Sequence, residues 1–194
     1  MSSPSIATAT PSEQQRVIAT FVMAFSSDPI ARWVWPEPDR YLTYFPEFVP
    51  LFGGKAFEHG TAYCADGFAA ASLWLPPGVH SDEEAMGESL QRSVAEGDQE
   101  KVFAFFEQMG VYHPTEPHWY LPIIGVDTVH QGRGYGSALL MHALQNCDRD
   151  KLPAYLEASN EGSRRLYLRH GFEQIGEIQA GDSPPAWPML RQPR

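Results

Sequence analysis

A glycine-rich turn between two apolar segments constrains the fold of this chain more than any other feature of its sequence. Residues 123–126 form a short apolar run, and residues 134–146 carry apolar side chains at helical spacing. Gly132, Gly134 and Gly136 occupy alternate positions at the junction. Because glycine adopts left-handed conformations that other residues resist, the pattern predicts a strand, a tight turn and a helix.

The predicted turn has the character of an anion-binding site. Its N–H groups meet at a helix N-terminus, where the macrodipole adds roughly half a positive charge, and Arg133 can add a charge-assisted bond. The G-x-G-x-G spacing differs from the G-x-G-x-x-G of dinucleotide folds, and the Gly-Lys-Ser/Thr ending of a P-loop is missing. We interpret the turn as a cradle for a pyrophosphate; a plain connecting loop is the alternative.

A second strand and helix are predicted at residues 154–158 and 160–169. Asn160 is a favourable helix cap, and Ser163 and Tyr167 follow it on one face of the helix. Such a face can follow an extended ligand and end at a phenol, about 10 Å further along. The alternative for Tyr167 is a core tyrosine whose hydroxyl is satisfied internally.

The remaining segments mix strands and helices in a single α/β (α+β) layered unit. After a loose N-terminal arm over residues 1–11, strands are expected at 6–8, 61–64, 68–75, 118–126, 172–178 and 187–190. Helices are expected at 17–25 after a capping box at 12–15 and at 39–52, where Pro46 and Pro50 should break or bend the helix. A further helical region is expected from a box at 81–84 to about residue 109, with a weak point at Gly97. Asp28-Pro29 is interpreted as a helix stop, residues 33–36 as an aromatic loop, and Asp66-Gly67 as a hairpin turn.

Composition excludes several classes of protein. The chain has 194 residues and a net charge of −10, which argues against nucleic-acid and anionic-membrane partners and favours small amines. Cys64 and Cys147 are expected to be reduced thiols, and no signal peptide or membrane span is apparent, so a cytoplasmic location is expected. Residues 113–118 hold two histidines, but their spacing matches no zinc pattern and no metal is expected.

The order of these motifs resembles the acetyl-CoA signature of the GNAT acyltransferases. The resemblance rests on residues 126–136, followed by 156–160 and 166–172, and it spans roughly residues 74–172. Residues 73–78 and 118–126 are further similar to the branch that contains puromycin N-acetyltransferase. The resemblance implies one domain over residues 1–194, with 79–116 as a helical insertion. It also implies a mixed, mostly antiparallel, twisted sheet with splayed central strands and flanking helices.

The resemblance also implies a cofactor and site residues. Acetyl-CoA is the expected co-substrate. Pro122, which lacks an N–H, suits a bulge or the unpaired strand edge that the pantetheine arm would enter. The residues expected to contact it are Ile124, Gly125, Val126, Gln131, Gly132, Arg133, Gly134, Tyr135, Gly136, Ser137, Asn160, Ser163 and Tyr167. Tyr167 occupies the position of the family's general acid.

The general base is a separate hypothesis. Strand alternation places Tyr155, Glu157 and Ser159 on one face, which makes Glu157 the candidate for removing a proton from the attacking amine. An ordinary ion pair is the alternative role for Glu157, and His118 and Tyr120 are alternative bases.

The expected function is transfer of an acetyl group to the amine of a small molecule by direct attack. Acetylation of a peptide or protein amine, and a non-catalytic acyl-CoA-binding module, are the alternatives, and the chain is expected to be a monomer or a homodimer. Aromatic residues within 33–48 are candidates for an acceptor pocket or for ordinary core.

Overall fold

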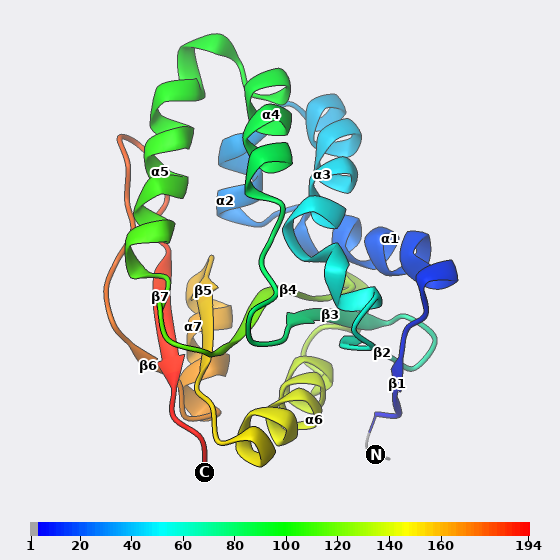
Figure 1. Ribbon diagram of the computed structural model, residues 1–194. Helices are drawn as coiled ribbons and strands as arrows, with labels where there is room; N and C mark the ends of the chain where they lie inside the picture. Colours follow the sequence, from blue (N-terminus) through cyan, green and yellow to red (C-terminus); the bar gives the residue numbers. More distant parts are fainter. Residues whose placement is uncertain (1–3) are drawn as a thin grey trace.

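A sheet with the strand order β1-β2-β3-β4-β5-β7-β6 organises the computed structural model, which describes residues 4–194 (Figure 1). Its strands are β1 (Ile6–Thr8), β2 (Ala62–Ala65), β3 (Ala70–Leu75), β4 (Trp119–Val126), β5 (Ala154–Ala158), β6 (Glu173–Gln174) and β7 (Trp187–Arg191). Neighbouring strands run antiparallel except β4 and β5, which are parallel. The predicted mixed, mostly antiparallel sheet with flanking helices is confirmed.

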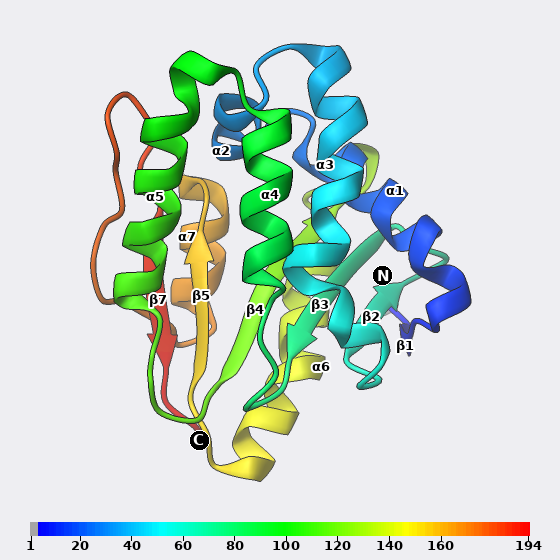
Figure 2. The same cartoon turned by 45° about the horizontal axis from the view of Figure 1, so that its top comes forward.

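Helices cover both faces of the sheet, as Figures 1 and 2 show. They are α1 (Gln14–Phe25), α2 (Pro29–Val34), α3 (Pro38–Gly53), α4 (Glu83–Ser93), α5 (Gln99–Tyr112), α6 (Tyr135–Asp150) and α7 (Glu161–Arg169), with short 3-10 turns at Pro11–Glu13, Gly54–Phe57, Glu96–Asp98 and Thr128–His130. Side-chain alternation divides the core: Leu73 and Leu75 pack with α1 to α5 on one face, whereas Trp74 packs with α6 on the other.

Several predicted boundaries are wrong near the N-terminus. The capping box is formed by Thr10 and Glu13, two residues before the predicted one. Asp28 does not merely stop a helix: its carboxylate caps α2, so residues 33 and 34 of the predicted loop are helical. The expected strand at residues 6–8 is present and pairs with β2, so this part of the predicted arm is not loose. Residues 1–3 of that arm lie outside the described residues.

Packing decides how the later segments compare with prediction. The helical region expected from residue 81 to about 109, with a weak point at Gly97, is divided into α4 and α5 at residues 94–98, where that weak point lies. Helix α3 continues through Pro46 and Pro50, because its buried face holds it against the core despite the lost hydrogen bonds. The strand expected at 172–178 shrinks to β6, and beyond it only Ile178 forms a bridge, with Ala186.

The two central strands separate, as predicted. Strands β4 and β5 pair only where Trp119–Leu121 face Ala154–Leu156, although β4 continues to Val126. The register between β3 and β4 shifts between Leu73 and Leu75, which adds one residue to β4 next to Pro122. Proline suits this bulge because it has no N–H to leave unpaired.

Gly125 of β4 sits where α1 crosses the sheet. A Cβ added there would lie 2.7 Å from Cβ of Ala24 and 3.0 Å from Cδ1 of Phe21. We therefore expect Gly125→Ala to lower the free energy of unfolding by about 2 kcal/mol, measured by urea denaturation. Gly87→Ala in α4 is the control, since its added methyl group meets open space and should leave stability equal or higher. Equal midpoints for Gly125→Ala and the unmodified chain would contradict the packing described.

Candidate functional site

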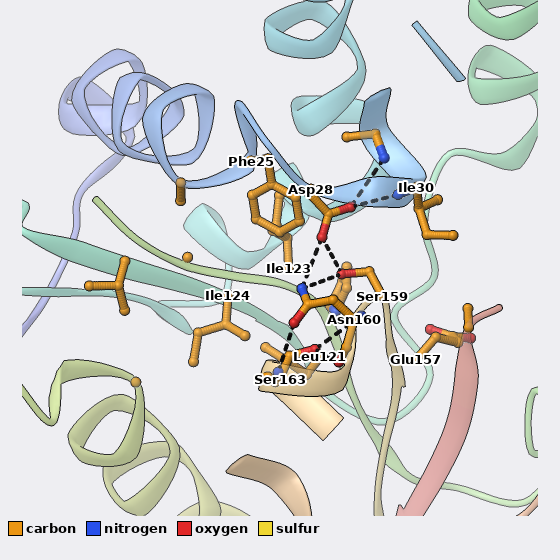
Figure 3. Close-up of a pocket in the computed structure, with 18 of the residues that line it drawn as sticks. Phe25, Asp28, Ile30, Leu121, Ile123, Ile124, Glu157, Ser159, Asn160 and Ser163 are labelled. Atoms are coloured by element: carbon orange, nitrogen blue, oxygen red, sulfur yellow. Dashed lines mark hydrogen bonds between the residues drawn. The ribbon is translucent and has the colours of Figure 1, made fainter. Parts of the chain in front are cut away.

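A cavity of about 690 Å³ opens where β4 and β5 diverge. The ends of these strands, the N-terminal ends of α6 and α7, and side chains from α1, α2, α3 and α5 line it. Figure 3 shows Ile123 and Ile124 of β4, Ser159 and Asn160 beyond β5, and Phe25 and Asp28 from the α1–α2 junction around this space. Residues from the first and last thirds of the chain therefore meet at one site.

The unpaired edge of β4 offers backbone groups to the cavity. Asp127 donates its N–H to the carbonyl of Ala69, so alternate residues of β4 face β3. By the same alternation, the N–H groups of Ile124 and Val126 point away from β3, toward the side from which β5 has diverged. This edge fits an extended amide-bearing chain, as predicted for both residues.

The glycine-rich turn has the predicted conformation. Gly132 and Gly134 have φ angles of 74° and 87°, and a Cβ at either position would meet no protein atom within 4 Å. Gly134 is the N-cap of α6, and no side chain caps this helix end. A Cβ on Gly136 would lie 3.1 Å from Leu166, so this glycine allows α6 and α7 to approach closely. An open, uncapped helix N-terminus of this kind fits a phosphate group.

Other predicted binding residues in the turn brace the protein itself. The side chain of Gln131 donates to the Val126 carbonyl at 3.3 Å, and the Tyr135 hydroxyl donates to Asp66 at 3.1 Å. Ser137 shares a hydrogen bond with His170, which joins the start of α6 to the end of α7. Gln131, Tyr135 and Ser137 line the cavity, whereas Arg133, which was also predicted to bind, is exposed and lies outside its lining. Their role toward a bound ligand stays a prediction.

Asn160 and Ser163 form the capping box of α7. The Asn160 Oδ1 accepts the Ser163 N–H at 2.9 Å, and the Ser163 hydroxyl donates to the Asn160 carbonyl at 2.8 Å. Figure 3 shows both side chains turned toward this network. Their polar groups hold the start of the helix, on the face that Tyr167 continues into the cavity.

Asp28 is a site residue that sequence reasoning missed. Its Oδ1 accepts the N–H groups of Ile30 and Ala31, and its Oδ2 accepts the Ser159 hydroxyl at 2.6 Å and the Asn160 amide at 3.1 Å (Figure 3). Burial raises the pKa of this carboxyl, and the hydrogen bonds oppose that rise. The Asp-Pro pair signals a helix cap, but nothing local signals a partner 131 residues away.

Glu157 is half-buried in the same cavity, on β5. The Tyr120 hydroxyl donates to its Oε2 at 2.9 Å, whereas Oε1 is buried and has no hydrogen-bond partner among the described residues. Burial raises the pKa of Glu157 to about 7, and the hydroxyls of Tyr120 and Tyr155 oppose part of this rise. A carboxyl group that titrates near neutrality can accept a proton in the physiological range.

Tyr167 lies between the α7 capping box and the cavity. Its side chain is buried beside Phe172, with ring centroids 5.9 Å apart, yet its hydroxyl makes no hydrogen bond to any described residue. Burial raises the pKa of Tyr167, and the nearby charges of Asp28 and Glu157 raise it further. The phenol therefore stays protonated and can donate a hydrogen bond to a group in the cavity.

The alternative base His118 lies outside the cavity lining. Its Nδ1 bonds the Glu116 carbonyl at 2.7 Å, so Nδ1 carries the proton, and its Nε2 accepts from Nε2 of His113 at 3.1 Å. Tyr120, the other alternative, contacts the site through its bond to Glu157.

The structure also bears on the expectations for the two cysteines, for a metal site and for a membrane span. Cys64 and Cys147 are buried and free of disulfides. In residues 4–194, no cluster of three histidine, cysteine or acidic side chains is arranged to hold a metal ion. Within the same range, none of the helices has the length and apolar character needed to span a bilayer.

Known proteins share this architecture. The chain is 27% identical to an uncharacterised N-acetyltransferase of Schizosaccharomyces pombe, over 93% of this chain and 80% of that protein. A crystal structure of histone acetyltransferase HPA2 and related acetyltransferase from Corynebacterium glutamicum is 26% identical, with a TM-score of 0.72 over 100% of this chain and 98% of the other. An agmatine N-acetyltransferase mutant in its apo form has a TM-score of 0.73 at 15% identity, over 98% of this chain and 100% of its own, and so shares the fold.

A family model identifies the catalytic class. The acetyltransferase (GNAT) family matches residues 67–172, which include β4, the glycine-rich turn, α6, β5 and α7. These are the elements that build the unpaired strand edge and the open helix N-terminus. The chain belongs to the GNAT family and is an acyltransferase that uses acetyl-CoA as co-substrate.

Proposed function

We propose that this enzyme transfers the acetyl group of acetyl-CoA to the amine of a small molecule by direct attack. One observation carries the proposal: Glu157, Tyr167 and the unpaired edge of β4 line a single cavity. A proton acceptor, a proton donor and backbone donors for an oxyanion are the groups that amine acetylation requires. Agmatine N-acetyltransferase, which shares the fold, is named for a small molecule, and this supports a small-molecule amine in preference to a protein as the acceptor here.

Glu157 would accept a proton from the acceptor's ammonium group. Transfer from an alkylammonium with a pKa of about 10.4 to an ordinary glutamate, with a pKa of about 4.3, costs about 8 kcal/mol. With the pKa of Glu157 at about 7, the same transfer costs about 4.6 kcal/mol. Burial of Glu157 therefore makes the carboxylate a stronger base without preventing its ionisation at neutral pH.

Tyr167 and the β4 backbone would act on the two ends of the reacting thioester. The N–H groups of Ile124 and Val126 can hold its carbonyl oxygen, a role that commonly contributes a few kcal/mol as negative charge develops. The protonated phenol of Tyr167 can donate to the leaving sulfur. Because burial raises its pKa above the ordinary value, Tyr167 supplies a strong hydrogen bond in preference to complete proton transfer.

The puromycin N-acetyltransferase branch stays a hypothesis based on residues 73–78 and 118–126. Acetylation of a protein amine is a second candidate, favoured by the histone acetyltransferase named among the structural relatives. Small-molecule acceptors are preferred because α2, α3 and α5 all contribute walls to the cavity. A panel of aminonucleosides, simple amines and lysine peptides separates these possibilities.

Binding of acetyl-CoA is expected to raise the Tm by roughly 5–10 °C at a concentration of about 100 Kd, because such binding adds about 2.7 kcal/mol to stability. Differential scanning fluorimetry measures the shift, and thiol release with the amine panel measures transfer. Gly134→Val is the matched variant: its φ of 87° disfavours a β-branched residue, and it should reduce the shift. An unchanged Tm with acetyl-CoA would refute the site.

A further inference from the structure

The end of the cavity away from the glycine-rich turn is walled by aromatic rings, which we call the aromatic chamber: Trp35, Phe45, Phe48, Phe52, Phe105 and Phe106. The rings form a continuous series, since Phe48 lies 5.6 Å from both Trp35 and Phe52 and 5.9 Å from Phe106, measured between centroids. Phe52 continues the series to Tyr120 at 6.1 Å, and Tyr120 donates to Glu157. The chamber therefore leads to the candidate base.

Apart from Glu157, the described lining of this cavity offers no carboxylate free to pair with a second positive charge. Among the described residues that line it, Asp28 and Glu157 are the acidic side chains. Asp28 already accepts four hydrogen bonds. The indole N–H of Trp35 is likewise used, since it donates to Ser93 at 3.0 Å. Oε1 of Glu157, which is buried and accepts no hydrogen bond among the described residues, is thus the carboxylate oxygen left to pair with an amine.

The acidic surface does not alter this conclusion. The chain has a net charge of −10, and many of its acids lie on residues 82–100. None of those residues lines the cavity. The surface can concentrate cations near the protein, but a second ammonium inside the chamber would lose its hydration and meet only aromatic ring faces. Their cation–π attraction, about 2 kcal/mol, does not replace the lost hydration.

We propose that the acceptor is a monoamine with an aryl or alkyl body and no second charge, a substrate class that rests on the proposed function. The aromatic chamber holds the body, and Glu157 receives the amine. Burying an apolar group of phenyl size contributes a factor of roughly 10 to 100 in affinity. The same walls discriminate against polyamines and against lysine side chains attached to a peptide.

The test compares acceptors matched in size. Hexylamine and 1,5-diaminopentane each have seven heavy atoms and differ by replacement of a terminal methyl group with an ammonium group. We expect kcat/KM with acetyl-CoA to be at least about 100-fold higher for hexylamine than for the diamine, with phenethylamine equal to or better than hexylamine. A preference for the diamine overturns the assignment while leaving the acetyltransferase function intact. Failure to acetylate any amine in the panel overturns both.

A charge placed in the wall provides a second test. Phe106→Glu adds a carboxylate to the chamber and should shift the diamine-to-hexylamine ratio of kcat/KM at least about tenfold toward the diamine. Phe106→Gln removes the ring without adding charge, and Val111→Glu adds the same charge to an 81% exposed position of the same helix. Neither control should reproduce the shift. Retention of the acetyl-CoA-induced Tm increase verifies that each variant folds. An unchanged ratio in a folded Phe106→Glu variant overturns the assignment.

Discussion

Replacing Tyr167 with phenylalanine is expected to lower kcat about 10³-fold while the Kd for acetyl-CoA changes by less than about twofold. The change removes a hydroxyl that makes no hydrogen bond to the described protein and therefore leaves no buried partner unsatisfied. What is lost is a donor that acts on the leaving sulfur in the transition state, so kcat should fall and ground-state binding should not.

Single-turnover kinetics together with acetyl-CoA titration distinguish these two quantities. Tyr63→Phe is the matched control, because it removes a tyrosine hydroxyl that accepts a bond from Asn146 and lies outside the cavity lining. Its kcat should stay near that of the unmodified enzyme. If Tyr167→Phe turns over at the normal rate, Tyr167 takes no part in the chemistry and its place in the cavity is structural.

Replacing Glu157 with glutamine is expected to lower kcat/KM by about 10²- to 10³-fold and to remove its rise with pH. A base must be ionised to accept a proton, so kcat/KM should increase as pH rises through the raised pKa of about 7. In Glu157→Gln this limb should disappear, since the amide does not titrate. A pH–rate profile of kcat/KM, measured between about pH 5.5 and 9 with saturating acetyl-CoA and the acceptor well below its KM, makes the comparison.

The substitution Glu157→Gln, which is expected to lower activity, should raise stability. Because the folded-state pKa of Glu157 lies above its unfolded value, ionisation of Glu157 opposes folding, fully above about pH 7 and not at all below about pH 4. At pH 8.5, the free energy of unfolding of Glu157→Gln should therefore exceed that of the unmodified chain by about 3 kcal/mol, with little difference at pH 4. Urea denaturation at the two pH values measures it. Glu107→Gln, at an exposed position of α5, is the control and should show neither effect. A stabilised variant with an unaltered pH–rate profile would make Glu157 a structural residue.

The local sequence pattern was sufficient to predict the elements that carry the proposed co-substrate site. Alternation located β5 at Ala154–Ala158 and placed Glu157 on the face of Tyr155 and Ser159, and the positive φ angles of Gly132 and Gly134 follow from the glycine spacing. Backbone conformation depends on adjacent residues, so these features are readable without a partner. Pro122 likewise indicated the bulge that precedes the separation of β4 and β5.

The same reasoning failed where distant contacts decide the outcome. Asp28 looked like a helix stop because its second role depends on Ser159 and Asn160, which approach only when β5 and α7 pack beside α2. The predicted strand at residues 172–178 was cut short because its pairing with β7 covers Glu173 and Gln174 and then ends after one hydrogen bond from Ile175 to Pro188. Neither result has a signal in the neighbouring sequence.

By itself, the sequence determined the glycine turn, the capped helix that carries Tyr167 and the strand face that carries Glu157, because dihedral preferences and side-chain periodicity act over a few residues. Only the tertiary structure decided that these groups share a cavity with Asp28, that the unpaired edge of β4 faces it, and that rings from α3 and α5 close it into an aromatic chamber. Those arrangements depend on which surfaces bury one another when segments far apart in the chain pack together, and burial also raises the pKa of Glu157 to about 7.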